Sequence, residues 1–123
     1  MTNTILAEQA IAAWRRAFAT GQFETLIALL DDTVQFRFGM APYHVTQHGK
    51  ARCMEAIEFL RECEIRVEQH PIAPTMHGVA SSGFEFKARG TVRGKAVEAD
   101  FIVIFDFANG RIARLCEYTP PAG

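Results

Sequence analysis

The chain has 123 residues, of which 49% are hydrophobic, and its 13 basic and 14 acidic side chains give a formal net charge of −1. Such a chain can bury a core without disulfide bonds or metal ions to stabilise it. Its near-neutral charge excludes the positive field that would attract nucleic acid or an anionic membrane. No apolar run is long enough to span a bilayer, and the start lacks an export signal. We therefore expect a single cytoplasmic domain over residues 1–123, with neither nucleic acid nor membrane as a partner.

Two amphipathic helices are expected at the start of the chain. Apolar residues recur at three- and four-residue steps over residues 5–20, as at Trp14 and Phe18, which is typical of a helix with one buried face. Gly21 is suited to end this helix. The same spacing returns over residues 23–30 and predicts a second, shorter helix.

A strand, a loop and a third helix follow. Residues 34–38 alternate between apolar and polar side chains, which predicts a strand that ends at Gly39. Residues 40–49 contain Pro42 and have no apolar period, so we expect an irregular loop. Helical spacing then predicts a third helix over about residues 50–64, with its charged side chains on the solvated face.

The remainder of the chain is predicted to form strands. The dipeptides Arg93-Gly94 and Asn109-Gly110 are turn signals, and the second is a strong hairpin signal. Consecutive hairpins predict an antiparallel meander. Its strands are expected at about residues 65–72, 83–92, 95–107 and 111–118.

Two segments resemble the nuclear transport factor 2-like superfamily. Residues 14–34, WRRAFATGQFETLIALLDDTV, are similar to its opening pair of helices, and residues 102–119, IVIFDFANGRIARLCEYT, are similar to its closing hairpin. Within the superfamily the chain is most similar to the SnoaL-like polyketide cyclase and ketosteroid isomerase group. The resemblance implies one SnoaL-like domain over residues 1–123 with an α+β, cystatin-like fold, in which three N-terminal helices pack on a curved, mostly antiparallel sheet to form a cone.

The resemblance also implies a pocket for a small hydrophobic molecule between the helices and the concave face of the sheet. The strand pattern agrees, because the apolar residues of neighbouring strands share one face. The alternative is that these side chains simply fill the core. The expected pocket residues are Trp14, Phe18, Phe36, Phe38, Tyr43, His48, Phe84, Phe86, Phe101, Val103, Phe105 and Leu115.

The opposite face of the sheet is the expected subunit interface. Ile102 and Ile104 lie there between Asp100 and Asp106, a mixture of apolar and acidic side chains that suits a subunit contact. In the superfamily this convex face often pairs two subunits. The resemblance therefore favours a homodimer.

The resemblance implies which positions would carry ketosteroid isomerase chemistry, and this chain lacks the necessary groups. Trp14 stands where the family's tyrosine donor falls, Phe36 where the base falls and Val103 where the protonated acid falls. Phenyl and isopropyl groups do no acid–base chemistry. The usual form of that reaction is therefore excluded.

The register of the last hairpin decides which residues of the closing strand face the pocket. A two-residue turn at Asn109-Gly110 would place Tyr118 on the pocket face. A three-residue turn with Gly110 as a bulge would instead place Leu115 and Glu117 there. The family's pocket positions match the second register, which we favour.

Glu117 is therefore the first catalytic candidate. Desolvation in an apolar pocket would raise the pKa of its carboxyl group and let it exchange a proton with an enolisable substrate. The alternative is a carboxylate at the rim of the cone, either hydrated or paired with an arginine.

His44 is the second catalytic candidate. With Tyr43 and His48 it is expected at the pocket mouth, where it would orient the substrate. The four-residue step from His44 to His48 would suit two metal ligands on a helix, but Pro42 and Gly49 interrupt this segment. No metal is expected.

Two classes of function remain open at this point. The first is a cofactor-free cyclase, isomerase or dehydratase that transfers protons on a small hydrophobic carbonyl compound. The alternative is a domain without catalysis, which binds a small ligand or another protein through the same fold.

Overall fold

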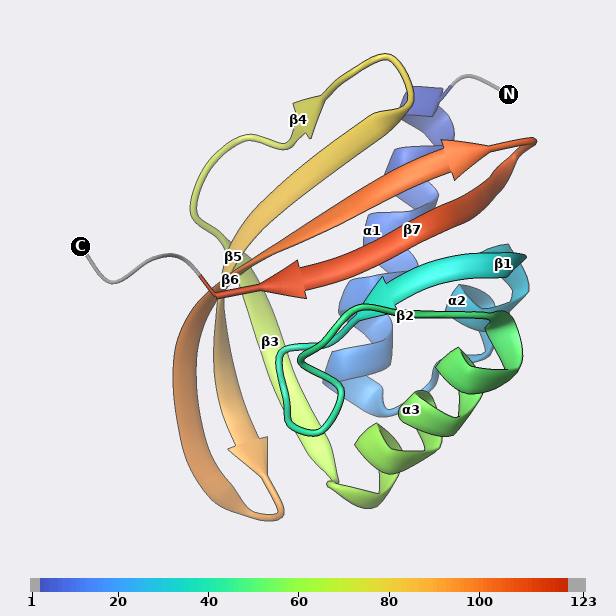
Figure 1. Ribbon diagram of the computed structural model, residues 1–123. Coiled ribbons are helices and arrows are strands. Elements are labelled where there is room, and N and C mark those ends of the chain that lie inside the picture. Colours follow the sequence, from blue (N-terminus) through green and yellow to red (C-terminus); the bar gives the residue numbers. More distant parts are fainter. Residues whose placement is uncertain (1–2, 120–123) are drawn as a thin grey trace.

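The computed structural model describes residues 3–119, so residues 1–2 and 120–123 of the expected domain lie outside the described part (Figure 1). The helices are α1 (Asn3–Thr20), α2 (Glu24–Leu29) and α3 (Lys50–Glu62), and within the described residues none of them is long and apolar enough to cross a membrane. The strands are β1 (Leu30–Arg37), β2 (Gln47–His48), β3 (Ile65–Pro71), β4 (Met76–His77), β5 (Ser81–Val92), β6 (Lys95–Ala108) and β7 (Arg111–Tyr118).

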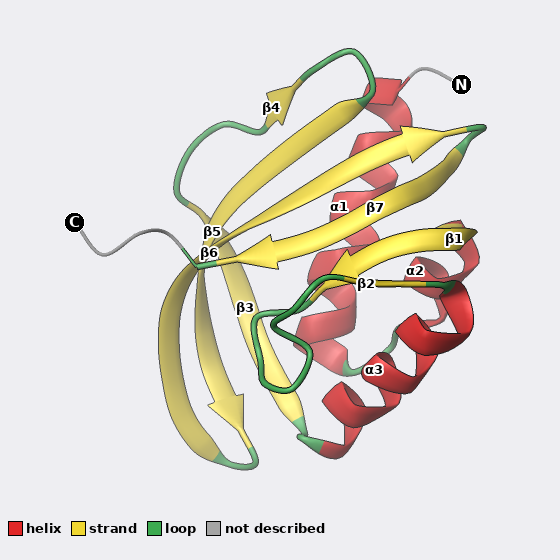
Figure 2. Cartoon of the chain, viewed as in Figure 1, coloured by secondary structure: helices red, strands yellow, loops and turns green. Residues whose placement is uncertain are grey.

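The strands form one strongly curved sheet, and the helices lie on one side of it (Figure 2). The strand order is β2-β1-β7-β6-β5-β3, and β4 pairs with the start of β5. β1 runs parallel to β7, and every other pairing is antiparallel. The predicted α+β class, with three helices packed on a mostly antiparallel sheet, is confirmed.

The alternation predicted for β5 and β6 is also confirmed, and it builds the core. Phe84 and Phe86 of β5 are buried, as are Val103 and Phe105 of β6, whereas Glu98 on the opposite face is exposed. α1 packs across the buried face of the sheet. Removing these apolar side chains from water stabilises this layer.

Some boundaries differ from the sequence prediction. The expected loops contain β2 and β4, two-residue strands that are too short for an alternating pattern to reveal. β1 begins at Leu30 rather than at residue 34, because Leu30 pairs with Ile112 of β7, a long-range contact. α3 ends at Glu62, and Glu64 then adopts a φ of 51°, which a right-handed helix cannot contain.

The turn of the last hairpin differs from the one expected, but Glu117 has the expected orientation. Asn109 and Gly110 have φ values of 54° and 73°, the geometry of a two-residue type I′ turn, so the three-residue turn is wrong. A bulge at Ala113 inserts the extra residue further along β7. Glu117 consequently pairs with Val103 and lies on the inner face of the sheet.

Candidate functional site

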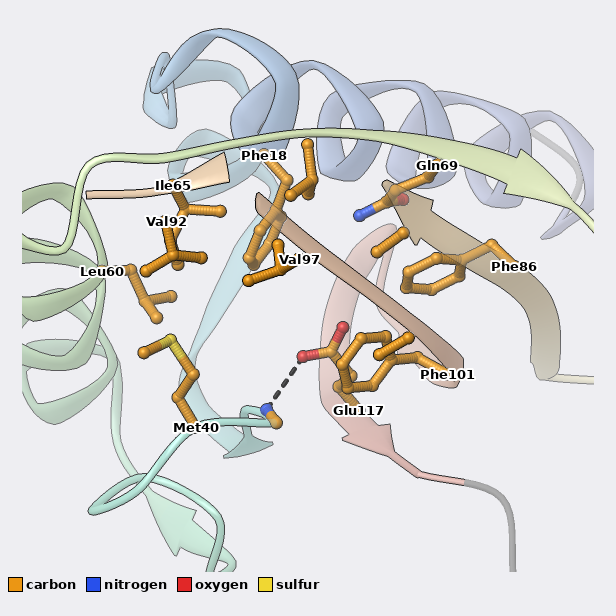
Figure 3. Close-up of a pocket in the computed structure, with 14 residues that line it drawn as sticks. Phe18, Met40, Leu60, Ile65, Gln69, Phe86, Val92, Val97, Phe101 and Glu117 are labelled. Atoms are coloured by element: carbon orange, nitrogen blue, oxygen red, sulfur yellow. Dashed lines mark hydrogen bonds between the residues drawn. The ribbon is translucent and has the colours of Figure 1, made fainter. Parts of the chain in front are cut away.

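An apolar cavity of about 320 Å³ lies between the inner face of the sheet and the helices (Figure 3). Four of the residues expected in the pocket or in its chemistry line this cavity: Phe18, Phe86, Phe101 and Glu117. Its remaining walls come from α3, from β3, β5 and β6, and from the start of the loop after β1. The size falls at the lower end of the range that is usual for small-molecule sites.

The wall of the cavity that β3 forms was not predicted from the sequence. Alternate residues of β3 face inward, namely Ile65, Val67 and Gln69, and the period of two along this strand is the signal that could have identified them. Gln69 pairs with Ala88 on β5, and Ala88 pairs with Ala99 on β6. Because two small side chains follow Gln69 across the sheet, space remains beside its amide group. The other missed lining residues are Gly39, Met40, Leu60, Val92 and Val97.

Seven residues expected to line the pocket lie in the packed core instead. Trp14 is fully buried, and its ring lies 4.5 Å from that of Phe18 and stacks on that of Phe38 at 6.2 Å. These rings fill the space between α1 and this part of the sheet. The cavity lies elsewhere on the inner face, where the small side chains Ala88 and Ala99 leave room. The seven residues are Trp14, Phe36, Phe38, Phe84, Val103, Phe105 and Leu115.

The three loop residues expected at the pocket mouth do not line the cavity. His44 and His48 are exposed, and the ring of Tyr43 packs against that of Phe59 with 5.4 Å between centroids. The loop contributes Gly39 and Met40 to the cavity. His44 is therefore not among the residues that line the cavity, and residues 3–119 contain no cluster of three metal-ligating side chains.

Glu117 is the one ionisable residue among the described residues that line the cavity. Its residue is only 6% exposed, and its Oε1 accepts a hydrogen bond of 2.8 Å from the backbone N–H of Gly39. Burial raises the pKa of this carboxyl from 4.5 to about 7, and the hydrogen bond from Gly39 opposes that rise. A carboxyl group with this pKa can both accept and donate a proton near neutral pH.

Gln69 is the second polar group of the cavity. The residue is 3% exposed, and its Nε2 and Oε1 atoms have no hydrogen-bond partner within the described part of the chain. Figure 3 shows the amide nitrogen directed into the cavity, away from α1. The backbone at this point is held in place, because Arg15 of α1 donates a 3.0 Å hydrogen bond to the carbonyl oxygen of Gln69.

The family comparison covers most of the chain. The sequence model of the SnoaL-like domain family matches residues 11–115. No curated protein matches the chain.

Solved structures with the same fold cover nearly the whole chain. An NTF2-like protein from Anabaena variabilis superposes with a TM-score of 0.87 at 24% identity, covering 98% of this chain and 92% of its own. A candidate polyketide cyclase from Pseudomonas putida has a TM-score of 0.76 at 23% identity, covering 98% and 93%. A candidate isomerase from Rhodopseudomonas palustris has a TM-score of 0.73 at 20% identity, covering 91% and 87%. At these identities the likeness is one of fold.

Proposed function

The chain belongs to the SnoaL-like domain family, within the nuclear transport factor 2-like superfamily, and on that premise we propose that it is a cofactor-free enzyme that moves a proton on a small, apolar carbonyl compound. The observation that carries this proposal is the carboxyl group of Glu117, buried in the wall of an apolar cavity. A carboxyl group with a pKa near 7 is suited to general acid–base catalysis at neutral pH.

The proposed step is the removal of a proton from the carbon next to the substrate carbonyl. The C–H bond breaks, an O–H bond forms on the Glu117 carboxylate, and the electron pair of the C–H bond passes into an enolate. Return of the proton to another carbon atom gives an isomer and regenerates Glu117. If the same enolate instead attacks a second carbonyl carbon of the substrate, a C–C bond forms and closes a ring. The π bond of that carbonyl opens to an alkoxide, which takes the proton back from Glu117.

The dimensions of the cavity limit the substrate. A volume of 320 Å³ corresponds to roughly ten water molecules at liquid density, and thus to a compound on the order of ten to fifteen non-hydrogen atoms. None of the fourteen lining residues is basic, so a negatively charged compound would lack a partner there. The names of the Pseudomonas and Rhodopseudomonas proteins favour the same reaction class.

Hydrogen–deuterium exchange tests the proposal with a simple probe. The ketone 1-indanone has about the right size and one enolisable carbon, and its exchange in D₂O can be followed by NMR. We expect the protein to accelerate exchange and Glu117→Gln to abolish the acceleration while retaining binding. The amide keeps the shape of the carboxyl group but neither gains nor loses a proton near neutral pH.

The same measurement separates catalysis from binding alone. If 1-indanone binds but exchanges at the rate seen without protein, the domain binds ligands and the catalytic proposal is wrong. If acceleration persists in the Glu117→Gln variant, another group transfers the proton.

A further inference from the structure

We propose that Gln69 orients the ligand, with its Nε2 donating a hydrogen bond to the ligand's carbonyl oxygen and its Oε1 accepting one from an adjacent hydroxyl group. The substrates would then be neutral hydroxy ketones with an otherwise apolar frame. This inference deepens the proposed function and rests on it, because Glu117 supplies the proton transfer and Gln69 holds the carbonyl group that the transfer needs.

The first support is the unsatisfied amide. Buried polar side chains in proteins nearly always have hydrogen-bond partners, because a buried amide without one loses the free energy of its hydration. Both polar atoms of Gln69 lack a partner within residues 3–119 although the residue is 97% buried, the complement of its 3% exposure. A leucine at this position would build the same strand without that cost. The amide is therefore best explained by a partner that arrives with the ligand.

The second support is the position of the amide. Its backbone is fixed by Arg15, and Ala88 and Ala99 continue its row across the sheet, so that no large side chain separates the amide from the cavity. Figure 3 places Gln69 and Glu117 on different walls of this cavity. A molecule between the two walls can thus contact both polar groups at once.

The third support is the chemistry of the amide itself. Nε2 is a donor and Oε1 an acceptor, and the two are held side by side on one planar group. A ligand that satisfies both must offer an acceptor next to a donor, as a carbonyl beside a hydroxyl group does. In the proposed reaction, the negative charge of the enolate would develop on the carbonyl oxygen held by Nε2, and a preplaced amide donor stabilises such a charge. A carboxylate also has acceptors, but it lacks the donor and would bring a second negative charge beside Glu117.

Three compounds of one shape test this inference. They are indane, which has no polar group, 1-indanone, which adds the carbonyl, and 2-hydroxy-1-indanone, which adds the hydroxyl, and their dissociation constants are measured by calorimetry. We expect Gln69→Leu to weaken 1-indanone about 10-fold, the effect of losing one net hydrogen bond, and 2-hydroxy-1-indanone more strongly. Indane should bind the variant as well as the wild-type protein or better.

Two further variants control the experiment. Gln69→Met has similar length and no amide, so it should show the same selective loss if Gln69→Leu fails to fold. Val67→Ala enlarges the cavity on the same face of β3 and should change the affinity of all three compounds by a common factor. Indane-2-carboxylate should not bind at pH 8, where Glu117 is ionised.

The outcomes distinguish this inference from the proposed function. If Gln69→Leu leaves the affinity ratio of 1-indanone to indane unchanged while Glu117-dependent exchange persists, the role of Gln69 is wrong and the proton transfer stands. If affinity depends on Gln69 but no exchange occurs, the ligand orientation stands and the catalytic proposal falls. If none of the three compounds binds the wild-type protein, both proposals are overturned.

Discussion

Gly39 and Glu117 are in direct contact although they lie 78 positions apart in the sequence: the backbone N–H of Gly39 donates a 2.8 Å hydrogen bond to Oε1 of Glu117. A Cβ atom at Gly39 would lie 2.9 Å from the same oxygen and 2.8 Å from Cε1 of Phe101. Position 39 therefore requires a residue without a side chain, because the backbone of the loop after β1 lies against Glu117 and Phe101 in the cavity wall.

Gly39→Ala should disturb this contact. The added methyl group must displace Glu117 or Phe101, and overpacking of this kind typically costs about 1–3 kcal/mol of unfolding free energy. A lengthened hydrogen bond should also raise the pKa of Glu117 further, because that bond favours the ionised form. Urea denaturation and an NMR titration of the carboxyl carbon measure the two effects.

Gly78→Ala is the matched control for that variant. Its Cβ would meet the nearest atoms at 3.7 Å, an ordinary van der Waals distance, so its stability should stay close to that of the wild-type protein. Equal stability losses in the two variants would contradict the argument from close approach.

Glu117→Gln should change how stability depends on pH. The carboxyl has a pKa of about 7 in the folded chain against 4.5 as its ordinary value, so folding favours the protonated form. The wild-type protein should therefore lose stability as pH rises from about 4.5 to about 7, by on the order of 3 kcal/mol, and keep that loss at higher pH. The variant lacks this titration, so the difference between the two unfolding free energies should grow across the same window. A constant difference from pH 4 to pH 8 would show that the carboxyl group is hydrated.

Gln69→Leu should raise stability while it impairs ligand binding. Replacing an amide that has no partner by an apolar side chain of similar volume removes a desolvation cost of about 1–3 kcal/mol. The midpoint of thermal unfolding should rise by several degrees. A destabilised variant would indicate that the amide has a structural partner, such as a bound water molecule, in the free protein.

The elements of the fold could be predicted because their signals are local. The alternation of Phe84 and Phe86 on β5, and of Val103 and Phe105 on β6, assigns each strand its buried face without knowledge of the rest of the chain. The Asn109-Gly110 turn is likewise encoded by adjacent residues.

The site could be predicted only in part, because packing between distant segments determines it. The inward orientation of Glu117 depends on a bulge at Ala113 that no turn motif announces. The cavity lies beside Gln69 rather than beside Trp14, because the rings around Trp14 close that part of the cone. The exposure of His44 follows from the path of a loop that has no periodic pattern.

Phe86→Ala and Phe105→Ala compare a cavity wall with a filled core. Both side chains are fully buried, but only Phe86 lines the cavity. Truncating Phe105 should cost about 3–5 kcal/mol, as is usual for a tightly packed phenylalanine, and truncating Phe86 should cost clearly less, because its ring already lacks neighbours on one side. Equal losses in chemical denaturation would mean that the cavity collapses in solution.

The face of the sheet opposite the cavity should pair two copies of the chain. Ile102 and Ile104 lie half-buried on this face, and the Cδ1 atoms of both would lie within van der Waals reach of a Cβ atom added at Gly83. Such branched apolar side chains on an open sheet favour a two-fold contact with the same patch of another copy.

Analytical ultracentrifugation should therefore find two chains per particle at concentrations on the order of 10 µM. An interface of standard size has a dissociation constant of about that concentration or lower. Ile104→Lys should give monomers, because the charge would be buried without a partner in the interface, while ligand affinity should persist because Ile104 lies outside the cavity lining. Met54→Lys is the control: Met54 is 46% exposed on α3, away from this face, and its substitution should leave the dimer intact. A wild-type protein that sediments as a monomer would exclude this interface, and a dimer that survives Ile104→Lys would place the contact elsewhere.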